Sequence, residues 1–439
     1  MPLRTLILIA FFLGSLPVCF FRPFYGIVLW IIVAFLNPQS YTWSFVDAFP
    51  WGVAVAVPTM AGMFLFDHRF DRLRSRLVFL LALLWVWFTV TTLISVNTPA
   101  FIHHAPDTWE RWKFVSKILL MSVCMIPVVS SFERLRYLVL TIAGCFGVYV
   151  AKALPFIILT GGEYRLYGPE RSMIGDNNDF GLALNMTLPL FFFLAHTESK
   201  PWVKRLFAFL FVITIPAIFF TYSRGALVGL ATVLTLMLLQ SRRRLALLPV
   251  IALAIGIAVF FAPPAWQQRM NPSGPGALDA SAQSRLNSWA YARNLAADYP
   301  ITGGGFATFT AQLYEQYAPI PREEALGPHS VYFQLLGEHG YVGLGLYLLL
   351  VLGCFIHIRR VRRTARARDD QQITYYSQML KFSLLGFLTS GFFLGRAYFD
   401  YFFAIVACVV ILDQIARERW VPHASAAAVP RQTPSEARV

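Results

Sequence analysis

The chain has 439 residues, of which 57% are hydrophobic and only 14% are charged, and its formal net charge at pH 7 is +14. Soluble domains have about 25% charged residues, so this composition excludes an ordinary soluble protein and indicates a polytopic membrane protein. Most of the positive charge lies in short loops between apolar runs, as in the cytoplasmic loops of membrane proteins, so we predict no nucleic-acid partner.

Apolar runs that meet or approach the roughly 20 residues needed to cross a bilayer recur along the chain. They are 3–21, 24–37, 51–66, 77–95, 115–131, 135–159, 180–196, 204–222, 224–240, 245–262, 331–357, 378–395 and 398–415. Arg22-Pro23 divides the first two, which form either one hairpin or one broken helix, and neither resembles a cleavable signal. We therefore predict an all-α membrane protein with about twelve transmembrane helices, surrounded by membrane lipids.

Every second loop between residues 66 and 377 is basic, which marks these loops as cytoplasmic. Their basic residues are Arg69 to Arg76, Arg134, Arg136, Lys200, Lys204, Arg205, Arg242 to Arg244, and six arginines between Arg359 and Arg368. The remaining loops, 38–50, 96–114, 160–179, 222–224, 263–330 and 396–397, are then expected to face outward.

The longest outward loop, 263–330, is predicted to form a small helical extracytoplasmic subdomain. A Pro/Gly/Ser-rich loop is expected through residue 283, then an amphipathic helix over 284–298 and a short helix around 307–317. Leu286, Trp289, Ala290 and Leu295 are expected on one side of the first helix. The predicted domains are transmembrane helices over 1–262, this loop, C-terminal transmembrane helices over 331–418 and a disordered cytoplasmic tail over 419–439.

Arg224 lies between two apolar runs with almost no loop between them. A charged side chain near the membrane is costly and usually functional. The alternative, an arginine that only reaches for lipid headgroups, fits the cytoplasmic side better than the outward side. Ser223 and Gly225 allow the backbone to turn sharply and approach a ligand closely.

Further cations are predicted to lie on the same side. Arg285, Trp289 and Arg293 share one stripe of the predicted loop helix, and guanidinium groups suit phosphate because their planar fork binds two oxygens. The alternative is a solvated helix face. The loop before the 180–196 run is dense in polar residues, which indicates either a lined cavity or a plain loop in which Asn178 or Asp179 caps the next helix.

His329 follows Pro328 directly before the 331–357 run, and a histidine there can take a proton near neutral pH. His339 is expected within the membrane, with a packing or hydrogen-bonding role. No outward loop offers carboxylates at metal-ligand spacing, and the five cysteines show neither disulfide nor zinc spacing, so no metal and no cofactor are expected. The glycines at 303–305 are only a weak phosphate-binding signal.

Taken in order, these motifs resemble the bacterial O-antigen ligase and polymerase superfamily, which includes the protein O-oligosaccharyltransferases. The segments concerned are Arg165…Gly168…Asn178, Ser-Arg-Gly-Ala at 223–226, Tyr-Pro-Ile-Thr-Gly-Gly-Gly-Phe at 299–306, and Pro-His-Ser…Glu-His-Gly-Tyr-Val-Gly-Leu at 328–344. The similarity covers about residues 160–350. Ser330 stands where the family usually has asparagine.

The resemblance implies a GT-C-type glycosyltransferase of the bacterial inner membrane, which transfers a glycan from undecaprenyl diphosphate on the periplasmic face without a metal. It implies that Arg224 and Arg285 handle the diphosphate and that His329 is catalytic. The residues predicted to bind the donor diphosphate or glycan are Arg165, Tyr167, Arg171, Asn178, Tyr222, Arg293 and Arg396.

A ligase that joins the glycan to the sugar of lipid A–core, a step of lipopolysaccharide biosynthesis, is the first choice because the 68-residue loop 263–330 can roof a large glycolipid acceptor. A polymerase that uses a second lipid-linked repeat, or a protein-glycosylating transferase, is the alternative. Outside this class, a transporter of the lipid-linked glycan would also need cations for the diphosphate, but would place them at mid-membrane with repeat symmetry.

Overall fold

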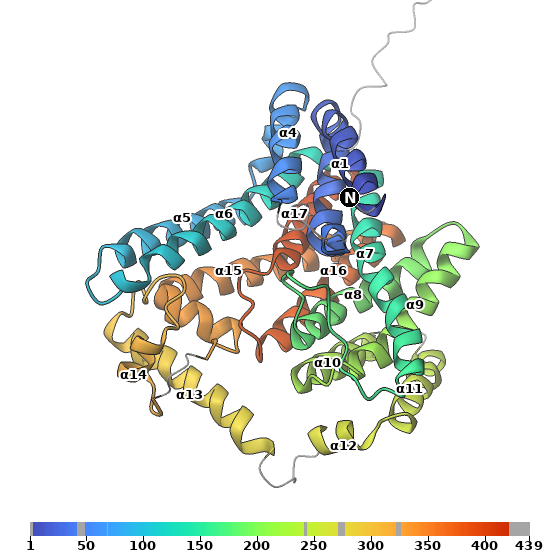
Figure 1. Ribbon diagram of the computed structural model, residues 1–439. Coiled ribbons are helices and arrows are strands. Elements are labelled where there is room, and N and C mark those ends of the chain that lie inside the picture. Colours follow the sequence, from blue (N-terminus) through green and yellow to red (C-terminus); the bar gives the residue numbers. More distant parts are fainter. Residues whose placement is uncertain are drawn as a thin grey trace, which may run out of the picture.

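The computed structural model describes residues 3–41, 49–67, 69–240, 244–270, 277–321 and 326–420. These residues form helices joined by short loops, and no strand occurs among them. The described part of the chain is therefore all-α, as predicted, with its helices arranged in a bundle (Figure 1).

The N-terminal helices gather at one end of the bundle, at the top of Figure 1. They are α1 (Leu3–Phe21), α2 (Pro23–Ile31) with its π-helical continuation η1 (Ile32–Leu36), η2 (Pro38–Tyr41) and α4 (Trp51–Phe66). Proline is well placed at the start of α2 because the first helical N–H has no partner within the helix. A Cβ at Gly62 of α4 would lie 1.8 Å from the carbonyl oxygen of Phe20, so α1 and α4 contact each other through the backbone.

Ten further helices complete the bundle. They are α5 (Arg76–Val96), α6 (Ala105–Val128), α7 (Phe132–Leu159), α8 (Asn177–Thr197), α9 (Pro201–Phe219), α10 (Arg224–Gln240), α11 (Arg244–Phe260), α15 (Val331–Ala367), α16 (Gln371–Gly391) and α17 (Asp400–Trp420), with the short turns η3 (Phe70–Leu73) and η4 (Ile102–His104) before α5 and α6. Helices α8 and α17 are buried along most of their length and form the centre. The side chains of Ser75, Ser131 and Asp370 accept hydrogen bonds from the first-turn amides of α5, α7 and α16, as helix N-caps do.

Six described helices are long and apolar enough to cross a membrane: α1, α5, α7, α8, α9 and α15. A seventh results if α11 and α12 (Pro264–Met270), which meet at an angle of 110°, count as one broken span. The polytopic character is thus confirmed. Each predicted apolar run lies mostly in a helix, but α2, α4 and α10 are short for a span. About twelve spans stays a prediction, as does the GT-C-type resemblance.

The segment between α11 and α15 has a small hydrophobic core of its own. Tyr291 and Leu295 of α13 (Ala277–Asp298) pack there with Leu313 and Tyr314 of α14 (Ala311–Tyr317). Helix α13 begins at Ala277, so the loop predicted through residue 283 is wrong at its end. Of the residues predicted to share one apolar side of this helix, Ala290 and Leu295 are buried. Leu286 is 60% exposed and does not pack with them, so its predicted place is wrong.

Helix α15 is interrupted at Gly340, whose φ of 66° lies in the left-handed region that favours glycine. At this break the amides of Gly304 and Gly305 donate to the carbonyl oxygens of Gly337 and Glu338, both at 2.9 Å. The glycine segment 303–305 therefore holds the two parts of α15 rather than offering these amides to a phosphate.

Two further boundaries differ from the prediction. Helix α6 begins at Ala105, so the outward loop predicted over 96–114 is confined to the residues before it. Helix α17 extends to Trp420, and the predicted disordered tail from there to residue 439 lies outside the described residues, as do His68, Arg242 and Arg243 of the basic loops.

Candidate functional site

The turn between α9 and α10 is tied to α12 by a reciprocal bridge of two arginines. Nε and Nη2 of Arg224 donate to the carbonyl oxygen of Arg269 at 3.1 and 2.6 Å. Nε of Arg269 in turn donates to the carbonyl oxygen of Tyr222 at 3.0 Å. The bridge fixes both guanidinium groups at the start of α10. Sequence reasoning missed Arg269, although an arginine in the outward segment next to Pro263-Pro264 was a usable signal.

Tyr222, predicted to bind the donor, has its hydroxyl engaged elsewhere. The hydroxyl donates to the carbonyl oxygen of Gly162 at 2.8 Å, and the ring is buried. Its φ of 59° gives the turn its sharp direction, which places Arg224 as the first residue of α10. Tyr222 thus shapes the turn, while its neighbour Arg224 lies at a helix N-terminus, where the peptide dipoles favour an anion.

Arg285 reaches the same region from α13. Its side chain is half-buried, and its guanidinium lies 5.9 Å from the ring centroid of Phe393. Burial lowers the pKa of Arg285, and the charge of Arg224 lowers it further. The charges of Arg165, Arg224 and Arg285 also act on Arg269. No carboxylate of the described residues forms an ion pair with any of these four arginines, so their mutual repulsion is unrelieved and an anion bound among them would relieve it.

His329 lies directly beside this arginine cluster, on the loop that precedes α15. It is half-buried, with a φ of 46°. Burial lowers the pKa of His329 and the charge of Arg285 lowers it further, while the carboxylate of Asp176 opposes both. The imidazole is therefore neutral at neutral pH and has a nitrogen able to accept a proton.

The segment 391–399 between α16 and α17 packs against both the arginines and the histidine. A Cβ at Gly395 would lie 2.6 Å from Cγ of Pro328, and one at Gly225 would lie 2.9 Å from Cβ of Phe393. Small residues at both positions thus allow this segment to press against Arg224 and His329 from one side. Neither glycine-mediated contact was foreseen from the sequence.

Arg396, in the same segment, forms an ion pair with Asp179 in the first turn of α8. One carboxylate therefore already balances its charge, unlike the charges of the arginine cluster. Asp176 caps α8, accepting from the backbone amide and the side-chain amide of Asn178, each at 2.8 Å. A residue of this loop therefore caps α8, as the capping interpretation predicted, but the cap is Asp176. The predicted capping residues, Asn178 and Asp179, lie in the first turn of the helix instead.

The other predicted donor-binding residues lie at the surface. Arg165 and Tyr167 are exposed in the loop before α8, and the charge of Arg165 reaches the cluster. Arg171 is exposed with a φ of 56°. Arg293 is exposed two turns beyond Arg285 on α13, and no contact between described residues joins it to the arginine cluster.

His339 is fully buried away from solvent. Its Nδ1 lies 2.7 Å from Oγ1 of Thr91, and its ring packs against Phe88 and Phe306 with centroids 4.3 and 4.5 Å apart. These contacts agree with the packing and hydrogen-bonding role predicted for it. Within the described ranges, no three His, Cys, Asp or Glu side chains gather as ligands of a metal ion would.

The fold and the site together define a polytopic helical membrane protein with an unneutralised arginine cluster and an adjacent neutral histidine. Residues 209–348 match the family model described as O-antigen ligase. This match confirms the resemblance: the chain has an O-antigen ligase family domain, of the O-antigen ligase and polymerase superfamily. Residues 3–199 match a family of unknown function (DUF5935), and comparison with curated proteins found no match.

The matched O-antigen ligase domain contains Arg224, Arg269, Arg285 and His329. Arg165 and the capping residue Asp176 lie instead in the part that matches the family of unknown function. The site is therefore assembled from both parts of the chain and from the segment 391–399 beyond them.

Proposed function

We propose that this protein is an O-antigen ligase, which transfers a glycan from undecaprenyl diphosphate to a sugar hydroxyl of lipid A–core. The observation that carries the proposal is the convergence of Arg165, Arg224, Arg269 and Arg285 beside His329. The O-antigen ligase family domain supports the same class of reaction.

The donor chemistry needs positive charge at the diphosphate. When the bond between the anomeric carbon and the diphosphate oxygen breaks, the electron pair stays on that oxygen and negative charge develops on the leaving group. Arg224 and Arg285 are already oriented, by the bridge to Arg269 and by Phe393, so they need little reorganisation to stabilise this charge. Their planar forks suit phosphate oxygens.

The acceptor chemistry needs a base. The acceptor hydroxyl attacks the anomeric carbon from the face opposite the diphosphate and loses its proton to a ring nitrogen of His329, which becomes an imidazolium. A positioned base of this kind contributes about 10²–10⁴-fold. Displacement from the opposite face inverts the anomeric configuration. In this scheme the arginines supply the charge stabilisation and no metal is needed.

The support for a large acceptor is the helical segment over the cluster. Helices α13 and α14 pack together around a small core that also includes Phe101, and α13 brings Arg285 to the site. The proposed setting is the bacterial inner membrane with the site on the periplasmic face, because the basic loops belong at the cytoplasmic face and the arginine cluster forms at loops of the other set.

The experiment is transfer by the purified protein with an undecaprenyl-diphosphate-linked glycan and lipid A–core, and with His329→Ala as the comparison. A glycan-bearing lipid A–core product that the variant does not form supports the proposal. Longer lipid-linked chains with unchanged lipid A–core would replace it by a polymerase. Product that forms only when a protein acceptor is added would indicate a protein transferase instead. Movement of the donor across vesicle membranes without any transfer would indicate a transporter.

A further inference from the structure

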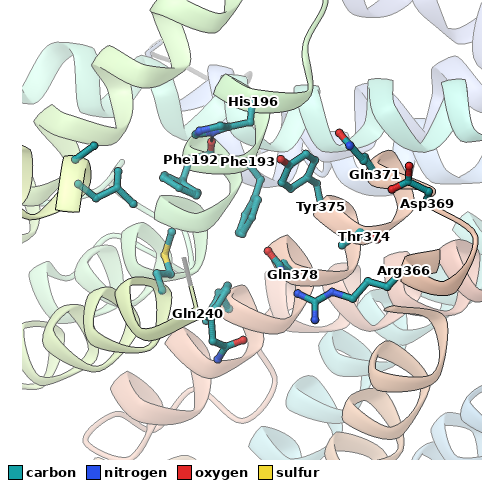
Figure 2. A pocket seen from close by; sticks show the side chains of 14 residues that line it. Phe192, Phe193, His196, Gln240, Arg366, Asp369, Gln371, Thr374, Tyr375 and Gln378 are labelled. Atoms are coloured by element: carbon teal, nitrogen blue, oxygen red, sulfur yellow. Dashed lines mark hydrogen bonds between the residues drawn. The ribbon is translucent and has the colours of Figure 1, made fainter. Parts of the chain in front are cut away.

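A cavity lies on the side of the basic loops, at the opposite end of α10 from Arg224. Its volume is about 680 Å³, and residues near the ends of α8, α10, α11, α15 and α16 line it (Figure 2). One wall is apolar and includes Phe192, Phe193, Met237 and Phe382. An apolar wall with Arg366 beside it suits an amphiphile.

One cation lines this cavity, and two more bond to amide side chains that line it. Arg366 lines it directly and, in Figure 2, extends its guanidinium toward Gln378 and Gln240. Lys381 donates through Nζ to Oε1 of Gln240 at 2.9 Å, and Arg362 approaches the same oxygen at 3.4 Å through Nη1. The amide oxygen of Gln378, in the orientation that satisfies its neighbours, accepts from Nη2 of Arg362 at 2.8 Å. Neutral amides therefore accept the hydrogen bonds of Arg362 and Lys381.

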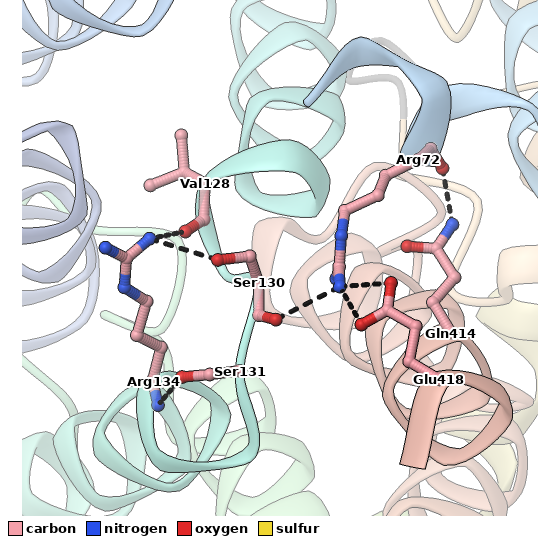
Figure 3. Close-up of polar contacts among 7 residues, drawn as sticks. All are labelled: Arg72, Val128, Ser130, Ser131, Arg134, Gln414 and Glu418. Atoms are coloured by element: carbon pink, nitrogen blue, oxygen red, sulfur yellow. Dashed lines mark hydrogen bonds and ion pairs between the residues drawn. The ribbon is translucent and has the colours of Figure 1, made fainter. Parts of the chain in front are cut away.

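Several other arginines at the same end pair with carboxylates. Arg72 forms an ion pair with Glu418 and donates to the carbonyl oxygen of Ser130 at 3.0 Å, and nearby Arg134 donates to the carbonyl oxygen of Val128 at 2.7 Å (Figure 3). Arg134 also lies 3.6 Å from Asp67. Further pairs of the same kind are Arg136–Glu198, Arg417–Asp413 and Arg419–Asp370.

The three cations at the cavity differ from this pattern. No carboxylate of the described residues lies within ion-pair distance of Arg362, Arg366 or Lys381. Asp369 also lines the cavity, beside Gln371 in Figure 2, and forms no ion pair with these three cations. The charges of Arg362 and Arg366, and those of Lys381 and Arg362, act on each other and remain uncompensated.

We propose that this cavity binds one anionic phospholipid of the adjoining leaflet. The headgroup phosphate lies between Arg362, Arg366 and Lys381, and an acyl chain lies along the phenylalanine wall. Basic pockets between transmembrane helices at the cytoplasmic side suit such headgroups, and each basic residue near an anionic membrane surface contributes about a fivefold gain in affinity. The lipid supplies negative charge to these three cations, as a carboxylate does for Arg72, Arg134 and Arg136.

The test uses the full-length protein, delipidated in a neutral detergent and titrated with phosphatidylglycerol, with native mass spectrometry to count bound lipid and thermal unfolding to measure stabilisation. We expect one tightly bound lipid. Arg366→Gln should weaken its binding about fivefold, and the triple variant Arg362→Gln/Arg366→Gln/Lys381→Gln about a hundredfold. Arg366 is exposed, so the single variant should fold.

The matched control is Arg359→Gln/Arg360→Gln/Arg363→Gln. It removes the same charge from exposed positions of the same helix end that neither line the cavity nor bond to its amides Gln240 and Gln378, and should change the affinity less than twofold. An equal loss in this control would overturn the proposal in favour of diffuse surface attraction. Equal stabilisation by inorganic phosphate would mean a site for a free anion, and equal binding of phosphatidylethanolamine would mean that headgroup charge is not recognised; either result would refute an anionic-phospholipid site.

Discussion

Replacing Arg224 separates the two roles that the structure gives to this side chain. It holds α12 through two hydrogen bonds to the carbonyl oxygen of Arg269, and it places a positive charge in the arginine cluster. Arg224→Gln removes the charge and the forked pair of donors. Arg224→Lys keeps the charge but presents a compact ammonium that cannot reproduce the planar fork.

The two losses differ in size. Two hydrogen bonds to a half-buried carbonyl contribute a net of about 1–3 kcal/mol to the attachment of α12, which is too little to unfold the bundle. A preorganised donor to the developing charge of the leaving group contributes about 2.7–4 kcal/mol to the transition state, or about 10²–10³ in kcat. We therefore expect Arg224→Gln to lower kcat by about 10²–10³ with a small change in Tm, and Arg224→Lys to lower it by about tenfold.

The assay is the initial rate of glycan transfer by the purified variants, with thermal unfolding measured in the same detergent. Lys113→Gln is the control, because it removes one exposed cation from the first half of α6, away from the arginine cluster. Wild-type kcat in a well-folded Arg224→Gln would remove Arg224 from the site. Equal losses of rate and Tm in the Gln and Lys variants would show that the bridge to α12 accounts for the whole effect, and would refute the charge argument.

Four further outcomes are expected. His329→Ala should abolish transfer with an unchanged Tm, whereas His339→Ala should cost on the order of 2–4 kcal/mol of stability by opening a buried cavity; the reverse pattern in paired rate and Tm measurements would mean that the roles are exchanged. Asp176→Asn keeps the cap on α8 but removes the carboxylate that raises the pKa of His329. His329 then stays neutral to lower pH, so the acid limb of the kcat/KM profile should move to lower pH. A move to higher pH would contradict the assignment. Gly395→Ala should lower kcat more than it raises KM, because its Cβ would lie 2.6 Å from Pro328 and displace the histidine; unchanged kinetics would show that the loop adapts. EDTA should leave the transfer rate unchanged, and an activity lost in EDTA and restored by magnesium would overturn the proposed mechanism.

Much of the helical architecture was predictable because a lipid environment leaves the backbone few choices. Polar backbone groups must pair within the segment, so an apolar run of sufficient length predicts a helix, and each predicted run lies mostly in one. The errors occur where a helix continues through polar residues. The first residues of α6, from Ala105 to Lys113, and of α13, from Ala277 onward, are helical but not apolar, and hydropathy does not detect them.

The candidate site was predictable in its chemistry but not in its completeness. Arg224 and His329 each adjoin an apolar run in a motif, and Arg285 lies on the predicted loop helix, so the sequence indicated all three. Arg269 and Gly395 belong to no such motif, and their importance comes from contacts with residues far away in the chain. Arg396 resembled the others in sequence, yet its ion pair with Asp179 separates it from the unpaired arginines.

By itself, the sequence determined that this is a helical membrane protein, which loops are basic, and which side chains carry a charge or can exchange a proton. These properties depend on residue type and on neighbours a few positions away. Only the tertiary structure decided which cations have a carboxylate partner, which amides are already bonded, and what surrounds His329. These properties depend on distances between segments such as α8, α13 and the 391–399 loop, because electrostatic repulsion, burial and hydrogen bonding act through space rather than along the chain.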